Sequence, residues 1–185
     1  MQKKEIPFLA SPNFNQRPQG LNIDMIVLHA ISLPDGEFEK YHIHDFFLNQ
    51  LNTSAHHSFS GLQDVKVSAH FVIARNGKIT QFVKTYDRAW HAGKSSWEGQ
   101  ENCNDFSIGI EIIGDERQPF TSKQYTETAR LCKTLMKHHK EIKKTRIVGH
   151  QDIAPTRKWD PGKQWNWSRF HRSFCHITNS DLDFD

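Results

Sequence analysis

Two apolar runs in this sequence each stop at a histidine, and the repetition indicates a shared site. His29 follows the run Asp24 to Leu28, and His150 follows the run Ile147 to Gly149. Short apolar runs of this kind fill buried strands, and functional side chains commonly lie on the segments that such strands hold in place. We therefore predict that the two imidazoles meet at one edge of a sheet.

A carboxylate lies close enough in sequence to join them. Asp160 lies ten residues beyond His150, and turns at Pro155 and at Pro161-Gly162 would bring it back toward the strand. Two imidazoles and one carboxylate are a ligand set of catalytic zinc, because they leave a fourth position for water. The spacing is no general zinc signature, so on the residues alone a metal site and ordinary hydrogen-bonded histidines both stay open.

Two further charged residues would complete a hydrolytic site. Glu111 lies between isoleucines in the run IGIEIIG, where an unpaired carboxylate is costly. It is either a general base tuned by partial burial, or the member of an ion pair or of a solvent-facing edge. Lys158, two residues before Asp160, would stabilise an oxyanion at the same place, or it is a solvated loop lysine.

The elements that must position these groups follow from hydrophobic periodicity. Asn76-Gly77 between two apolar runs predicts a hairpin, and the Thr-x-x-Gln capping box at Thr121 begins a helix with apolar positions as far as His139. The other predicted helices are residues 38–51 and 165–174, and the predicted strands are residues 24–28, 67–73, 79–83, 105–113 and 146–149.

Alternation within two of these strands predicts which side chains share a face. Residues 67–73 would place on one face Val67, Ala69, Phe71 and Ile73. Residues 105–113 would turn three isoleucines one way, at positions 108, 110 and 112, and would turn the other way Ser107, Gly109 and Glu111. Strands mixed with helices predict an α+β (mixed α/β) fold, with one central mixed β-sheet flanked by helices.

Length and composition limit the alternatives. The 185 residues fit a single domain with a hydrophobic core. We expect residues 1–20 to form an extended N-terminal arm with little regular structure, residues 21–175 the domain, and residues 176–185 a C-terminal tail. No apolar run approaches the roughly 18 residues of a membrane span, and the net charge of +3 comes without the dense basic runs typical of nucleic-acid binding.

The same features predict the compartment and the assembly. The N-terminus lacks the apolar core of a signal peptide. The three cysteines form no CxxC pair, which suits a reducing compartment. We therefore expect a cytoplasmic monomer with neither membrane nor nucleic-acid partners.

Four segments of the sequence resemble the AmpD-type zinc amidases, a branch of the family 2 N-acetylmuramoyl-L-alanine amidases and of the peptidoglycan recognition protein superfamily. They are IVLHAISLPDGEF, VSAHFVIARNGKITQFV, DRAWHAGKSSWEGQENCNDFSIGIEIIG and VGHQDIAPTRKWDPG, and the resemblance extends from about Leu21 to Phe170. It implies hydrolysis of the amide bond between (anhydro-)N-acetylmuramic acid and L-alanine in small muropeptides during peptidoglycan recycling.

The resemblance also implies a role for individual residues. The ligands of Zn²⁺ would be His29, His150 and Asp160, and the catalytic groups would be Glu111 for acid–base chemistry and Lys158 for the tetrahedral intermediate. Substrate-binding roles are expected for Trp90, His91, Arg157 and Lys66. For Trp90 and His91 the alternative is a core tryptophan beside a hydrogen-bonded histidine.

The chain departs from the family pattern at three positions. Ala30 stands where an asparagine is common, and Lys66 where an arginine is common, so substrate affinity is placed in doubt. Ala69 precedes His70 where other branches have tyrosine, which leaves the acid–base role to Glu111. We expect His70 to be structural, and the other histidine pairs to lie on loops or on the surface, at His42, His44, His56 and His57.

Two other functions remain possible at this stage. The same chemistry could act on intact peptidoglycan, as in a lysin, or the chain could be a muropeptide-binding sensor without catalysis. A complete ligand set favours an enzyme over a sensor.

Overall fold

A five-stranded mixed sheet forms the centre of the computed structural model, which describes residues 4–177 and 182–185. The order across the sheet is β10, β3, β9, β4 and β5. The first four strands are parallel, and β5 pairs antiparallel with β4 through the predicted Asn76-Gly77 hairpin. Their bounds are β3 Met25–Ile31, β4 Phe71–Ile73, β5 Ile79–Gln81, β9 Ser107–Ile113 and β10 Ile147–Gly149.

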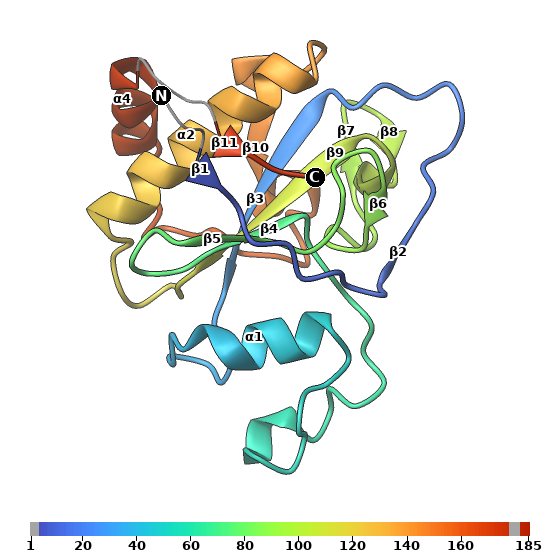
Figure 1. The fold of residues 1–185 in the computed structure, drawn as a ribbon, viewed down its shortest axis with the longest axis vertical. Helices are drawn as coiled ribbons and strands as arrows, with labels where there is room; N and C mark the ends of the chain where they lie inside the picture. The colour runs from blue at the N-terminus through green and yellow to red at the C-terminus, as the bar shows by residue number, and fades with distance from the viewer. Residues whose placement is uncertain (1–3, 178–181) are drawn as a thin grey trace.

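Helices pack against the sheet, and one helix, α1 (Lys40–Phe47), lies beyond its lower end in the view of Figure 1. The other α-helices in the described part of the chain are α2 Ser122–His138, α3 His150–Ile153 and α4 Trp167–His176. Helices α2 and α4 pack against each other on one side of the sheet, while α1 and the loop that follows it form a separate lobe (Figure 1). The predicted α+β fold is confirmed, and no helix among the described residues is long and apolar enough to cross a membrane.

The two faces of β9 differ as the alternation predicts. Ile108, Ile110 and Ile112 join the apolar cluster that contains residues of α2 and α4. Met25 and Val27 of β3 pack instead in a second cluster on the opposite face. That opposite face is also the face of Ser107, Gly109 and Glu111, and it is where the site lies.

Two of the predicted strands differ from the observed ones. Strand β3 does not end at His29 but continues to Ile31, because Ala30 and Ile31 pair with Ile112 and Ile113 of β9. The strand predicted at 67–73 begins only at Phe71, because the backbone N–H of Ser68 donates to the Trp90 carbonyl 3.1 Å away instead of joining the ladder.

The single apolar face predicted for residues 67–73 is therefore wrong. Phe71 and Ile73 pack in the α2 cluster, whereas Val67 and Ala69 pack in a cluster with α1. The alternation breaks where the chain leaves the sheet, between Ala69 and Phe71.

The predicted helices exist, with shifted ends. The capping box of α2 is present, with the Thr121 hydroxyl accepting from the Gln124 N–H and the Gln124 side chain accepting from the Thr121 N–H. Helix α1 is shorter than residues 38–51. Helix α4 begins two residues later than predicted, because the Asn166 side chain caps it by accepting from the Arg169 N–H.

The described part of the N-terminal segment is built into the fold. Its strand β2 (Phe14–Asn15) pairs with β6 (Arg88–Ala89). The remaining short pairs are β1 (Lys4–Glu5) with β11 (Leu182–Asp183), and β7 (Ser96–Trp97) with β8 (Gln100–Glu101). Just past β2, the Arg17 guanidinium donates to four backbone carbonyls, those of Thr85, Asn104, Asp105 and Ser107.

Replacing Arg17 with methionine should destabilise the protein by about 2–4 kcal/mol, because buried carbonyls lose a charged donor while the apolar stem is kept. The free energy of unfolding from urea titration measures this, with the exposed Arg172→Met as the matched control. Equal stability of the two variants would show that the arm does not hold the fold together.

Candidate metal centre and active site

Three buried side chains converge on one point. The Nδ1 atom of His29 lies 2.9 Å from Nδ1 of His150 and 3.2 Å from Oδ2 of Asp160. The remaining pair, His150 Nδ1 and Asp160 Oδ2, is 3.1 Å apart. No other group of three potential metal ligands occurs within the described parts of the chain.

Strand register brings these three residues together. Leu28 of β3 pairs with Gly149 of β10, and the next residue in each segment is a histidine, His29 or His150. The pairing therefore places the two histidines side by side. The intervening loop closes where the backbone N–H of Gln151 donates to the Asp160 carbonyl 2.8 Å away. The sequence prediction that His29, His150 and Asp160 lie together agrees with this geometry.

The chemistry of the donors fits a cation. The Nε2 atom of His150 lies 3.0 Å from the Ala92 carbonyl, which can only accept, so the neutral ring carries its proton there and turns the Nδ1 lone pair to the site. Burial lowers the pKa of His29 to about 4, which keeps that ring neutral. The third donor is the Asp160 carboxylate, whose Oδ2 lies 3.2 Å from Nδ1 of His29 and 3.1 Å from Nδ1 of His150.

The separations also suit zinc. Nitrogen and oxygen ligands about 2.0–2.2 Å from tetrahedral zinc lie about 3.3 Å from one another. The observed separations of 2.9, 3.2 and 3.1 Å are near that value. Two nitrogen lone pairs and a carboxylate therefore surround a space that a small divalent cation would fill.

Glu111 lies directly beside this cluster. It is the register partner of His29, and its Oε1 is 3.9 Å from His29 Nδ1. Its Oε2 atom is buried and has no hydrogen-bond partner among the described residues. Burial, reinforced by the Asp160 charge, raises the pKa of Glu111 well above its usual value, while Lys158 acts in the opposite direction.

A cavity of about 310 Å³ opens onto these groups. Glu111, Lys158 and Asp160 supply its polar floor. An apolar wall comes from α1 and from the loop after it, through Phe46, Phe47, Leu62 and Val65. A ligand here would contact both a charged reaction centre and an apolar surface.

The comparisons with known proteins decide the family. The family model described as N-acetylmuramoyl-L-alanine amidase matches residues 19–163. The chain belongs to this family. It is 47% identical over 162 residues to the 1,6-anhydro-N-acetylmuramyl-L-alanine amidase AmpD of Haemophilus influenzae, which covers 88% of this chain and 88% of that protein.

Solved structures agree with this assignment. The amidase resembles a crystal structure of an AmpD derivative with a TM-score of 0.88 and 40% identity, over 94% of this chain and 99% of that one. It also resembles the Escherichia coli amidase AmiD in complex with anhydro-N-acetylmuramic acid-L-Ala-D-gamma-Glu-L-Lys, with a TM-score of 0.62 and 28% identity. That match covers 85% of this chain and 60% of AmiD.

The residues predicted to bind substrate in the amidase differ in their exposure and in their contacts with the rest of the protein. Trp90 is partly exposed and lines both the main cavity and an adjoining hollow of about 220 Å³. Lys66 is exposed and lines the hollow. Arg157 lines it too, but its Nη2 donates to the carbonyls of Ala92 and Lys94, so the guanidinium is partly used within the protein.

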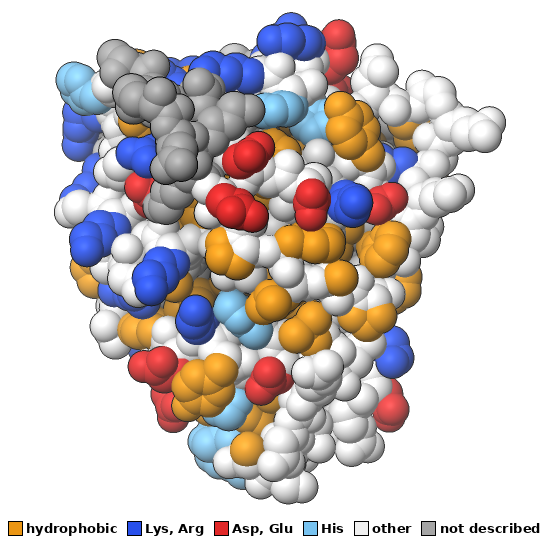
Figure 2. Space-filling model, viewed as in Figure 1, with side chains coloured by type: hydrophobic (Ala, Val, Ile, Leu, Met, Phe, Trp, Pro, Cys, Tyr) orange, Lys and Arg blue, Asp and Glu red, His pale blue; other side chains and the backbone are white. Residues whose placement is uncertain are grey.

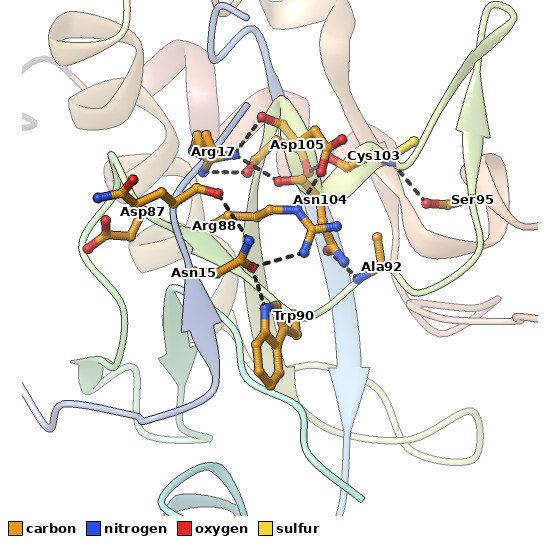
Figure 3. Close-up of polar contacts among 12 residues, drawn as sticks. Asn15, Arg17, Asp87, Arg88, Trp90, Ala92, Ser95, Cys103, Asn104 and Asp105 are labelled. Atoms are coloured by element: carbon orange, nitrogen blue, oxygen red, sulfur yellow. Dashed lines mark hydrogen bonds and ion pairs between the residues drawn. The ribbon is translucent and has the colours of Figure 1, made fainter. Parts of the chain in front are cut away.

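The N-terminal arm contributes a residue that the sequence analysis missed. The Oδ1 atom of Asn15 accepts from the Trp90 indole N–H at 2.7 Å and from Arg88 at 3.2 Å (Figure 3). Arg88 is in turn paired with Asp105. An asparagine in a polar arm carries no signal of such a role.

The remaining histidines of the amidase lie outside the metal cluster. His70 is fully buried, and its Nδ1 accepts from the Gly109 N–H at 2.9 Å while its Nε2 lies 3.1 Å from the Asp87 carbonyl. These backbone contacts with Gly109 and Asp87 are consistent with the structural role expected for His70. The pairs in and after α1 belong to the lobe at the lower end of the molecule, where histidine side chains gather on the surface (Figure 2).

Glu111→Gln should stabilise the metal-free protein at neutral pH. The raised pKa means that the folded protein keeps this proton to higher pH than the unfolded chain does. The stability is therefore complete below the ordinary glutamate pKa and falls as pH rises toward the folded-state value. Urea unfolding with a chelator present should show a growing advantage for the glutamine variant from pH 4.5 upward. An advantage that stays constant or shrinks would contradict the raised pKa.

Proposed function

We propose that this protein is a zinc-dependent amidase that cleaves the bond between (anhydro-)N-acetylmuramic acid and L-alanine in small muropeptides, as a step of peptidoglycan recycling. The observation that carries the proposal is the complete set of His29, His150 and Asp160, with Glu111 and Lys158 lining the same cavity. A site for binding alone needs no unpaired buried carboxyl beside such a cluster.

The named relatives support the substrate class. The Haemophilus influenzae relative is named for the 1,6-anhydro sugar and the L-alanine bond. The AmiD neighbour was solved with an anhydromuramyl tripeptide. Because this chain covers 88% of the Haemophilus influenzae protein, the similarity extends over nearly the whole relative.

Each side chain then has a task in the hydrolysis. Zinc held by the three ligands would supply a Lewis acid that makes hydroxide available at neutral pH. Glu111, with its free Oε2, removes the proton from the attacking water and returns it to the departing alanine nitrogen. The Lys158 ammonium stabilises the negative charge that develops on the carbonyl oxygen.

Glu111 must be ionised to act as a base, and its ionisation depends on the charges around it. Burial keeps the pKa of the Glu111 carboxyl high in the metal-free protein. A cation in contact with Asp160 and His29 would lower that pKa by charge attraction, as Lys158 already does. A bound cation would therefore favour the ionised, reactive form of Glu111.

We further propose that the enzyme acts as a monomer in the cytoplasm. All the residues assigned to the site come from one chain. The three cysteines are free thiols, which suits a reducing compartment.

The central test is mass spectrometry of an anhydromuramyl tripeptide after incubation with the protein. We expect the anhydromuramic sugar and the free tripeptide as products, with cleavage abolished by a chelator and restored by zinc. Asp160→Ala should show no cleavage, and Glu111→Gln should lower kcat by about 10²–10⁴ while zinc still binds. Intact substrate with zinc-loaded protein would overturn the proposal, and parallel assays on intact peptidoglycan and for binding alone would identify a lysin or a sensor.

Trp90→Ala should raise KM several-fold to about tenfold with a smaller change in kcat, because an aromatic contact surface is lost. Asn15→Leu should change KM in the same direction and by less, because the indole stays but loses its hydrogen bond. Steady-state kinetics on the same tripeptide measures both, with the exposed Tyr86→Ala as control. An unchanged KM in Trp90→Ala would remove this residue from the substrate site.

A further inference from the structure

We propose that His91 is a positioning residue for the metal ligand His29, and not a substrate-binding residue. A chain of hydrogen bonds runs from His29 through His91 and Ser107 to the carbonyl of Cys103. This relay selects the ring tautomer of His29 that turns the Nδ1 lone pair toward the metal. The inference rests on the metal-dependent function proposed above.

The geometry of the relay is continuous. His29 Nε2 lies 3.0 Å from His91 Nδ1, with the two rings edge to face at an interplanar angle of 83°. The other ring nitrogen of His91, Nε2, lies 3.4 Å from the Ser107 hydroxyl. That hydroxyl makes a short hydrogen bond to the Cys103 carbonyl. The side chains of His29, His91 and Ser107 are all buried, at 1%, 8% and 0% exposure.

The last member of the relay dictates the direction of every bond. A carbonyl only accepts, so the Ser107 O–H must donate to Cys103 and its oxygen is left to accept from His91 Nε2–H. A neutral His91 with its proton on Nε2 has a bare Nδ1, which accepts from His29 Nε2–H. A neutral His29 with its proton on Nε2 has a bare Nδ1. That nitrogen is the one that faces His150 and Asp160.

His150 reaches the same state by a shorter route, because its Nε2 donates directly to the Ala92 carbonyl. Both imidazole ligands are thus set by hydrogen bonds that end on backbone carbonyls. Hydrogen bonds of this kind on the second ring nitrogen orient metal-binding histidines and raise their basicity.

The protein holds the His91 ring firmly in this position. A Cβ atom at Gly109 would lie only 2.4 Å from the ring, so the ring rests directly on the bare backbone of β9. The backbone N–H groups of His91 and Ala92 both donate to Asn104 Oδ1, at 3.1 and 2.8 Å. Figure 3 shows the contact between Ala92 and Asn104, together with Arg17, whose guanidinium donates to the carbonyls of Asn104 and Asp105.

The competing interpretation is direct contact between His91 and the substrate, since the ring borders both hollows of the site. Both of its ring nitrogens, however, are already occupied by His29 and Ser107. A substrate hydrogen bond would have to displace one of them. The geometry therefore favours the positioning role.

The direct test is ¹⁵N NMR of the histidine rings in the unmodified protein, with and without zinc. Long-range ¹H–¹⁵N correlations distinguish the two neutral tautomers. We expect the proton on Nε2 of His91 in both states, and the His29 Nδ1 resonance to shift when zinc is added. A proton on Nδ1 of His91 would overturn the relay, and this result is independent of whether the protein is active.

Variants test the consequence for the metal. His91→Leu should weaken zinc affinity by about 10–100-fold in competition with a chromogenic chelator. His91→Asn should retain more of the affinity, because its side-chain oxygen can accept near the former Nδ1. The zinc affinity of Ser107→Ala should lie between those of the unmodified protein and His91→Leu. This variant still tests the relay if His91→Leu does not fold.

The matched control is His139→Leu, because His139 is a buried histidine that is also hydrogen-bonded to a hydroxyl, that of Thr85. It should lose stability without losing zinc affinity. A raised KM with unchanged zinc affinity in His91→Leu would establish direct substrate contact and overturn the proposal. If the unmodified protein binds no zinc, the proposed function is contradicted. The histidine tautomers of the zinc-free protein would still show whether the relay exists.

Discussion

The parallel pairing of β3 with its two neighbours is the constraint on which the whole site depends. On one side it places His150 level with His29, through the pairing of Gly149 with Leu28. On the other side it places Glu111 directly opposite His29. Because side chains alternate between faces, a slip of one residue in either pairing would send a ligand or the base to the α2 side of the sheet. The apolar packing that specifies the register therefore also specifies the reaction centre.

Strand β9 shows how much chemistry one face of a strand can carry. Parallel strands covered on both sides are normally apolar throughout, yet one face of β9 carries Ser107, Gly109 and Glu111. Ser107 is the last side chain of the hydrogen-bond relay, Gly109 leaves room for the His91 ring, and Glu111 lines the cavity. The opposite isoleucine face holds the strand against α2 and α4. Stability and chemistry are thus divided between the faces of a single element.

Residue patterns could predict the parts of the structure that repeat along the chain. Alternation gave the two faces of β9, the capping box gave the start of α2, and the repeated strand–histidine pattern placed His29 beside His150. The same reasoning failed at residues 67–73, because a contact with the distant Trp90 backbone pulls Ser68 off the sheet. Such a contact leaves no periodic trace in the sequence.

The parts that could not be predicted are those in which loops and the arm meet. Asn15 and Arg17 lie in a polar segment, and only the folded chain brings them to Trp90 and to the Asn104 carbonyl. His91 was expected at the substrate because the family motif contains it, whereas its distances to His29 and Ser107 depend on three separate segments. Sequence spacing cannot show which of two nearby roles a side chain takes when the deciding contact is tertiary.

The electrostatics of the site connect its stability with its activity. The Nδ1 atoms of His29 and His150, which carry lone pairs in the proposed tautomers, lie 2.9 Å apart, and the Glu111 carboxyl lies beside the buried Asp160 carboxylate. These contacts are unfavourable in an interior of low dielectric constant. A divalent cation would turn each of them into an attraction and would ionise Glu111. The fold therefore holds together, through the tautomers proposed for His29 and His150, a set of groups whose mutual repulsion the proposed cation would offset.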